Sequence, residues 1–169
     1  MNNMATKESW QNVPINNPKS VNISEIAPDL KLFFSEEQYK MLHKGLIPKQ
    51  MEDKWFIYFE NDWLYFHRSW TGNGIFKAKI TKEMGEQEDQ EYKINEFYVE
   101  RDKNIYKNDE DIYDLDVLLQ LILWGLLNID VRGFYLKKYC SSQKGTIRAW
   151  SEFGRLFFNE KDIDKKEKK

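Results

Sequence analysis

Cysteine and histidine are scarce in this chain. Among 169 residues there are one cysteine, Cys140, and two histidines. A single cysteine excludes an internal disulfide, so a reducing compartment such as the cytoplasm fits best. A zinc site built from cysteine and histidine would lack ligands. We therefore predict a site that contains no metal, and the sequence indicates no cofactor.

Several motifs that carry chemistry are also missing. The chain has no GxGxxG sequence and no Walker-type glycine loop, which are the usual phosphate-binding motifs. The acidic run at residues 109–111 has the charge of a calcium loop, but the required glycine and terminal glutamate are absent. A nucleophile pair of Cys140 and His67 has no local support in the sequence.

Long apolar runs are absent as well. The longest, residues 115–127, is interrupted by Asp116 and Gln120 and is too short to span a bilayer. No apolar segment follows a basic N-terminal start, so we expect no secretory signal. These features predict a soluble, cytoplasmic protein without a membrane partner.

Aromatic residues and charge are plentiful. Aromatics make up 15% of the chain, and a chain of this length buries roughly two thirds of its unfolded surface. Charge is distributed unevenly, because residues 81–116 carry a balance of −8 and residues 117–158 a balance of +4. Such a surface can steer a charged partner, although it more often keeps a domain soluble.

Composition divides the chain into three parts. Residues 1–20 are rich in asparagine and poor in apolar side chains, which predicts a mobile or loosely docked arm. Residues 21–158 are expected to form a single α+β domain. Residues 159–169 alternate charges and are expected to form a charged C-terminal tail.

Residues 51–80 form an aromatic block, and the predicted sheet begins there. It contains three of the six tryptophans. Residues 55–60 and 63–69 predict two strands joined by a hairpin turn at Asn61-Asp62. Alternation then places Trp55, Ile57, Phe59, Leu64, Phe66 and Arg68 on one face, which we assign to the core. The other face holds Phe56, Tyr58, Glu60, Trp63, Tyr65 and His67, and suits a partly wet groove or a covering helix.

The remaining pattern completes an α+β fold. Residues 75–80 and 91–101 predict a third and a fourth strand, so we expect an antiparallel sheet of about four or more strands. Ser35 and Gln38 have the spacing of a capping box at a helix start. The apolar residues of 112–127 predict a buried helix packed on one face of the sheet. A last helix is expected at 146–158.

The run from His67 to Gly72 is the most suggestive of a site. It combines an imidazole, the guanidinium of Arg68, the hydroxyls of Ser69 and Thr71, and a glycine loop with backbone N–H groups. Such groups bind phosphates and other anions. Trp63, Tyr65 or Trp70 would stack on a ring. Alternatively, Arg68 stacks only on Trp55 as a cation–π pair, and residues 71–74 are only a loop.

Two acidic residues lie at the start of the block, just before its first expected strand. Glu52 and Asp53 are candidates for a general acid or base, with His67 as the proton-transfer group they would orient. The hairpin register places Asp53 opposite Trp70 and near Arg68, so a plain ion pair is the simpler interpretation.

A basic segment lies further along the chain. Residues 132–155 interleave positive charges with aromatic residues, which is the composition of a surface for nucleic acid or an acidic partner. Core packing explains Trp150 and Phe153 better, so nucleic acid is not the partner we expect.

The sequence MEDKWFIYFE followed by LYFHRSWTG, within residues 51–80, resembles that of an uncharacterised bacterial domain. This domain is similar to segments found beside or fused to ADP-ribosylglycohydrolase-type proteins. The resemblance implies an accessory role in ADP-ribose or nucleotide-linked metabolism or defence. It implies no catalytic residues for this chain.

Three hypotheses about function follow. The first is a small binding or accessory domain that recognises a nucleotide-like or ADP-ribose-like anion at residues 67–74. The second is an enzyme that acts on a nucleotide-type substrate, with His67 as acid and base. The third is a protein-interaction module that uses the exposed aromatic sheet face.

Overall fold

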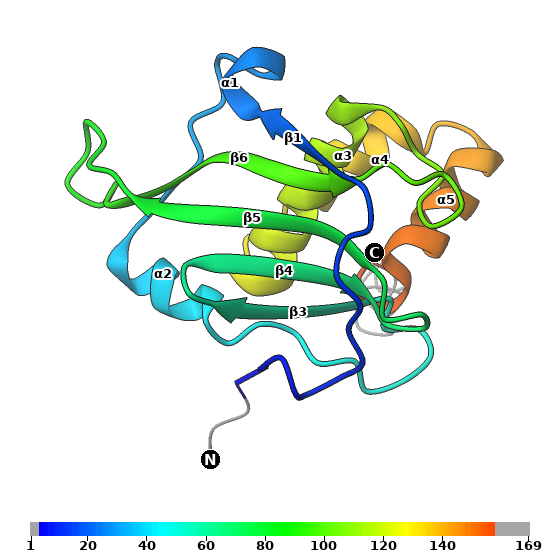
Figure 1. Cartoon of the computed structure of the whole chain (residues 1–169). Helices are drawn as coiled ribbons and strands as arrows, with labels where there is room; N and C mark the ends of the chain where they lie inside the picture. Colours follow the sequence, from blue (N-terminus) through cyan, green and yellow to red (C-terminus); the bar gives the residue numbers. More distant parts are fainter. Residues whose placement is uncertain (1–3, 158–169) are drawn as a thin grey trace, which may run out of the picture.

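Six strands and five α-helices form an α+β fold over residues 4–157, the part of the chain that this computed structural model describes (Figure 1). The strands are β1 (Pro18–Asn22), β2 (Phe33–Phe34), β3 (Trp55–Glu60), β4 (Trp63–Arg68), β5 (Gly74–Lys82) and β6 (Tyr92–Glu100). The helices are α1 (Ile23–Ile26), α2 (Glu36–Leu42), α3 (Asp111–Leu119), α4 (Arg132–Tyr139) and α5 (Gln143–Phe153). A π-helical segment, η1 (Gln120–Leu126), continues α3, and a 3₁₀ turn, η2 (Gly154–Leu156), follows α5. The expected fold class is confirmed.

The sheet is antiparallel and has the order β1-β6-β5-β4-β3, with β2 pairing against another part of β6. From β3 to β6 each strand pairs with the next along the chain, as expected for a meander. Figure 1 shows the sheet in front and α3, α4 and α5 behind it. The described helices therefore cover one face, which we call the inner face, and none of them lies on the opposite outer face.

The hairpin of β3 and β4 has the predicted register. Trp55 lies opposite Arg68, and Glu60 lies opposite Trp63. At the turn, Asn61 and Asp62 have φ values of 51° and 67°, the left-handed conformation that a two-residue turn of this kind requires at both positions. Asparagine and aspartate tolerate that conformation. The turn therefore fixes the register of the hairpin, and the register decides which side chains face the core.

The core lies between the inner face and the helices. Trp55, Ile57, Leu64 and Phe66 are buried there, so the face assigned to the core from alternation is confirmed. The helical residues buried against them include Leu115, Leu118, Leu121, Ile122, Tyr135 and Phe153. Burying this apolar surface is the main favourable contribution to folding.

The start of α2 has the predicted capping box, and a glycine lies in the loop after the helix. The Ser35 side chain accepts a hydrogen bond from Gln38 N, and the Gln38 side chain accepts one from Ser35 N. Gly45, beyond the helix, has φ of 63°, and a Cβ built there would lie 2.2 Å from the carbonyl oxygen of Ile57. Glycine therefore lets the loop approach β3 closely.

The C-terminal helices differ from the prediction in their bounds. The single helix expected at 112–127 is α3 followed by the π-helical η1. The last helix begins at Gln143 and not at 146, because the Ser142 side chain caps it by accepting a hydrogen bond from Gly145 N. It ends at Phe153, where Gly154 has φ of 54°. Residue 158 and the predicted tail at 159–169 lie outside the described residues.

The N-terminal segment, residues 4–17, crosses the strands at one end of the sheet (Figure 1). Val13 N donates to the carbonyl oxygen of Gly72 at 2.7 Å, and Gly74 N donates to that of Val13 at 2.7 Å. Two asparagine N–H groups of the segment donate to the buried carboxylate of Glu100. Backbone pairing of this kind holds a segment that has few apolar side chains of its own.

Candidate functional site

The outer face contains a buried aromatic layer at one end. Phe56 and Tyr58 are buried there against Ala5 of the N-terminal segment. Tyr58 stacks on Tyr65 with ring centroids 4.8 Å apart. The wet groove or covering helix expected on this face is therefore replaced, at this end, by the N-terminal segment.

A small cavity lies between the N-terminal segment and the outer face. Its volume is about 220 Å³. Tyr58, Tyr65, His67 and Lys77 line it from the sheet, and Asn12, Pro14 and Ile15 line it from the segment. We call it the sheet-face cavity. Burial raises the pKa of Tyr58 to about 12 and also raises that of Tyr65, so both phenols are neutral rings near pH 7.

Beside this cavity, the outer face carries a cluster of aromatic and lysine side chains: Trp63, Lys77, Lys79 and Tyr98. The Trp63 and Tyr98 rings lie 5.8 Å apart. Lys77 Nζ lies 5.0 Å from the centroid of Trp63 and 5.1 Å from that of Tyr98. Lys79 Nζ lies 5.9 Å from Trp63. We call this set the Trp–Lys cluster.

Cross-strand pairing explains the Trp–Lys cluster. Trp63 pairs with Lys79 across β4 and β5, and Lys77 pairs with Tyr98 across β5 and β6. The paired side chains therefore point to the same side of the sheet. Within the described chain, neither lysine forms a salt bridge with a carboxylate. Both amines are thus available to an anion.

His67 is buried, with 3% of its surface exposed. Its Nδ1 lies 2.9 Å from the carbonyl oxygen of Gly72. Burial lowers the pKa of the imidazole, and the hydrogen bond to Gly72 opposes this only in part. A neutral imidazole in a cavity wall can contribute a ring surface and one polar nitrogen. It is less suited to act as a general acid and base, which must take up and release a proton freely.

Arg68 points to the inner side of the sheet. Its guanidinium lies 4.5 Å from the centroid of Trp55, and it pairs with the carboxylate of Glu152 at 2.9 Å. The cation–π alternative considered for this residue is thus present in the structure. The structure does not place Arg68 beside Trp63 or Tyr65, whose side chains lie on the outer side.

The loop after Arg68 uses its polar groups internally. Ser69 is buried, and its Oγ donates to the carbonyl oxygen of Asp53 at 2.6 Å. Thr71 Oγ1 accepts from Asn73 N, and Gly72 N donates to the carbonyl oxygen of Arg68. Most of the N–H groups that an anion nest would need are therefore engaged.

Trp70 is the exposed member of this loop, with 62% of its surface exposed. Its indole Nε1 donates to the carbonyl oxygen of Met51 at 3.1 Å. Trp10, from the N-terminal segment, is 38% exposed and donates to the carbonyl oxygen of Ser69 at 2.8 Å. Both rings are held in place by their indole N–H groups.

Glu52 and Asp53 lie in a different cavity, a cleft of about 880 Å³ between residues 46–55 and the C-terminal helices. The Asp53 carboxylate pairs with Arg155 through two contacts of 2.9 Å. The backbone carbonyl of Glu52 accepts from Arg155 N at 3.0 Å. The structure thus gives Asp53 an ion pair with Arg155. Neither acidic side chain makes a polar contact with His67 among the described residues.

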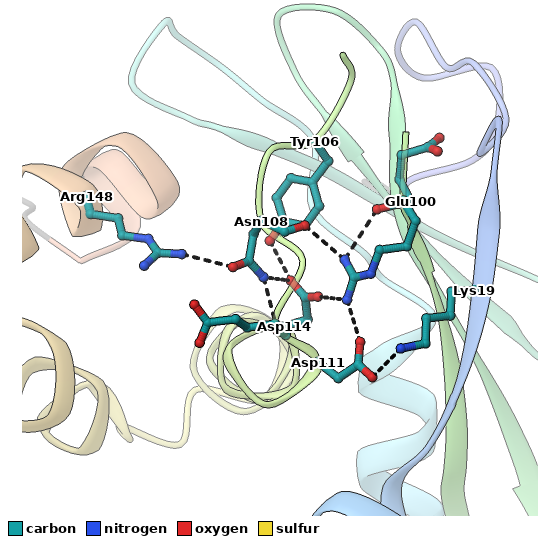
Figure 2. A network of polar contacts seen from close by, with 9 residues as sticks. Lys19, Glu100, Tyr106, Asn108, Asp111, Asp114 and Arg148 are labelled. Carbon is teal, nitrogen blue, oxygen red and sulfur yellow. Dashed lines mark hydrogen bonds and ion pairs between the residues drawn. The ribbon is translucent and has the colours of Figure 1, made fainter. Parts of the chain in front are cut away.

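A further group of charged residues lies between β6 and α3 (Figure 2). Arg101 donates to Asp111 at 2.6 Å and to Asp114 at 2.5 Å. Asp114 is fully buried and also accepts hydrogen bonds from Tyr106 and Asn108, each at 2.7 Å. Burial opposes the charge of Arg101, but the two carboxylates outweigh it and raise its pKa.

This network is structural in character. Figure 2 shows Arg148 reaching Asn108 and Lys19 reaching Asp111, so the network joins α5 and β1 to the start of α3. Neither Arg101 nor Asp114 lines the sheet-face cavity or the cleft. A buried pair that forms several hydrogen bonds within the protein holds the connected elements in position.

The described residues contain neither a metal-site cluster nor a membrane-spanning helix. No cluster of three or more histidine, cysteine, aspartate or glutamate side chains in this part of the chain has the arrangement of a metal site. Across residues 4–157 we find no helix with the length and apolar character needed to cross a bilayer.

Comparison with known proteins adds no assignment. No family model, no curated protein and no solved structure matches this chain. The geometry of the cavities and of the Trp–Lys cluster is therefore the main guide to function.

Sequence reasoning placed Trp63, Tyr65 and His67 on one face, and the structure brings all three to the outer side. It missed Lys77, Lys79 and Tyr98 as partners of Trp63. The signal was present, because Lys77 and Lys79 alternate with the apolar residues of β5. The sequence does not show the register of the neighbouring strands, which decides which of their residues lie beside Trp63.

Proposed function

We propose that this chain is a small binding domain that recognises a nucleotide-like ligand on the outer face of its sheet. The ligand's ring stacks on Trp63 or Tyr65, and its anionic group lies against Lys77 and Lys79. This keeps Trp63 and Tyr65 from the three ring-stacking residues expected from the sequence, leaves out Trp70, and replaces Arg68 with the two lysines as the anion-binding groups.

The observation that carries the proposal is the Trp–Lys cluster. Two ammonium groups lie within 6 Å of one tryptophan ring and have no carboxylate partner among the described residues. Tryptophan provides a stacking surface for a base, and an ammonium attracts phosphate as a point charge. A ligand with a planar base and an anionic phosphate, such as a nucleotide, satisfies both groups at once.

The sheet-face cavity adds a second point of recognition. It adjoins the cluster, because Lys77 belongs to both. Its wall of neutral tyrosine rings and the buried imidazole of His67 suits an uncharged ring better than a phosphate. The resemblance of residues 51–80 to segments near ADP-ribosylglycohydrolase-type proteins supports ADP-ribose as the first compound to test.

The test is a titration of the full chain with ADP-ribose, NAD and cyclic nucleotides, followed by melting temperature and calorimetry. We expect at least one of these compounds to raise the melting temperature and to bind more weakly as salt is added, because salt screens the lysines. If the melting temperature and the heat signal stay unchanged with all of them, the proposal is contradicted.

Substitutions locate the site. In Trp63→Ala we expect a loss of affinity of about tenfold or more, since stacking on an aromatic side chain contributes roughly 1–3 kcal/mol per base. The double variant Lys77→Ala, Lys79→Ala should lower affinity and reduce its dependence on salt. Lys82→Ala, at the exposed end of the same strand, is the matched control and should bind as the original chain does.

A protein partner is the second candidate, and the exposed indoles of Trp10 and Trp70 favour it. Tryptophan is enriched among residues that dominate protein interfaces, and side chains already held by hydrogen bonds lose less entropy on binding. Purification of the tagged chain from its native cells should then recover a partner that is lost in Trp10→Ala, Trp70→Ala. Recovery that is unchanged in this variant, but lost in Trp63→Ala, would move the interface to the outer face.

A further inference from the structure

A cavity on the opposite side of the molecule lies between α3–η1 and α4. Its volume is about 390 Å³. Leu119 and Leu123 line it from one helix, and Val131 and Phe134 from the other side. It is mostly apolar, and Phe134 beside it is 77% exposed. None of its lining residues belongs to the sheet-face cavity or to the Trp–Lys cluster.

The polar groups of this cavity have partners, with one exception. Lys138 Nζ pairs with the Asp116 carboxylate at 2.8 Å, and the Tyr139 hydroxyl donates to the same carboxylate. Gln120 Nε2 donates to the carbonyl oxygen of Val131 at 2.8 Å. Gln120 Oε1 has no hydrogen-bond partner among residues 4–157, although Gln120 is only 4% exposed.

The unpartnered oxygen is unusual. Most buried side-chain acceptors in proteins have a hydrogen-bond partner, and one without a partner calls for a physical explanation. Almost none of the surface of Oε1 is accessible to solvent. Because the terminal torsion of a glutamine side chain is soft, the amide of Gln120 can turn its oxygen towards a donor seated in the cavity.

The backbone at this position is also irregular. Gln120 is the first residue of the π-helical η1, in which the Leu127 N–H reaches back to the carbonyl oxygen of Ile122. Such segments are rare inside helices, and they frequently occur at functional sites. The cavity, the unpartnered acceptor and the π-helical backbone therefore coincide at one residue.

We infer that this cavity is a second binding site, for a small apolar molecule that carries one N–H or O–H donor. The apolar part contacts Leu119, Leu123 and Phe134, and the donor bonds to Gln120 Oε1. The charges of Asp116 and Lys138 neutralise each other, so the site selects a neutral ligand. A ligand of this class differs in charge from the anion proposed for the outer face.

Indole and 1-methylindole are suitable probes because they share an apolar ring system and differ in the N–H donor. Calorimetric titration of the full chain should show indole binding about tenfold more tightly than 1-methylindole, which corresponds to about 1.4 kcal/mol. In Gln120→Leu, indole should bind no more tightly than 1-methylindole. Gln143→Leu, an exposed glutamine at the start of α5, should leave both affinities unchanged.

A second variant tests the place of binding. Leu123→Trp fills the cavity, so it should abolish binding of both probes, and circular dichroism and melting would verify its fold. Equal affinities for the two probes in the original chain, no binding of either, or indole binding that survives Leu123→Trp would each overturn the inference. Trp63→Ala should leave the selectivity for indole intact, which separates this site from the one on the outer face.

Discussion

The guanidinium of Arg68 is bound to Glu152, a residue 84 positions later in the chain. One nitrogen donates to the backbone carbonyl oxygen of Glu152 at 3.2 Å and another to its carboxylate at 2.9 Å. The indole of Trp55 donates to the same carbonyl oxygen at 2.8 Å. These bonds attach the end of α5 to the first hairpin of the sheet.

Replacing Arg68 should therefore cost stability. Glu152 is buried, with 6% of its surface exposed, and removing one partner of a buried pair leaves the other charge uncompensated. We expect Arg68→Met to lower the free energy of unfolding by about 3 kcal/mol, measured by urea denaturation. Arg155→Met breaks the more exposed pair with Asp53 and should cost at most about 1 kcal/mol.

The same variants separate the roles proposed for Arg68. If Arg68→Met retains its stability but loses affinity for ADP-ribose, then Arg68 contacts the ligand and the structural role is wrong. If stability falls and the affinity of the folded fraction is unchanged, Arg68 holds the fold and the lysines remain the anion-binding groups.

Stability should depend on pH through His67. Burial lowers the pKa of His67 in the folded chain, so the unfolded chain takes up a proton first as pH falls below about 6.5. The unfolded state then holds more protons, and the free energy of unfolding decreases with falling pH by up to about 1.4 kcal/mol per pH unit. Above about pH 7.5 both states are neutral at this residue and the dependence vanishes.

Denaturation of the original chain and of His67→Gln at several pH values between 5 and 8 measures this effect. The difference in unfolding free energy between the two proteins should change over pH 5–7 and stay constant above pH 7.5. A constant difference across the whole range would mean that the imidazole titrates equally in both states, as it would if it were open to solvent.

Ser35 should stabilise the start of α2. Its side chain accepts the N–H of Gln38 in a capping box, and loss of such a cap costs about 1 kcal/mol. We expect Ser35→Ala to lower the urea midpoint accordingly, and Ser35→Asp to retain most of the stability. A loss in Ser35→Asp as large as that in Ser35→Ala would show that the hydroxyl acts other than as a cap acceptor.

The parts of the fold that local chemistry decides could be predicted. The hairpin register follows from Asn61-Asp62 and the alternation around it, and the capping box follows from the spacing of Ser35 and Gln38. Both involve residues close together in the chain, so the relevant interactions are visible in a short stretch of sequence.

Long-range pairing could not be predicted in the same way. Nothing near Arg68 indicates that its partner is Glu152, because the pairing depends on where α5 packs. The docking of residues 4–17 depends on backbone hydrogen bonds with Gly72 and Gly74, which leave no apolar periodicity in the sequence. The π-helical segment that begins at Gln120 is likewise absent from the apolar pattern of residues 112–127.

The position of β1 at the edge of the sheet affects the order in which the chain can assemble. Among the described strands β1 pairs only with β6, and the paired residues Pro18 and Glu100 are about 80 positions apart. At a synthesis rate of roughly 5–20 residues per second, β1 leaves the ribosome roughly 4–16 s before its partner strand. During that interval the hairpin of β3 and β4 can close by itself, whereas β1 has no edge to join. The strand that comes early in the chain is therefore added to the sheet late.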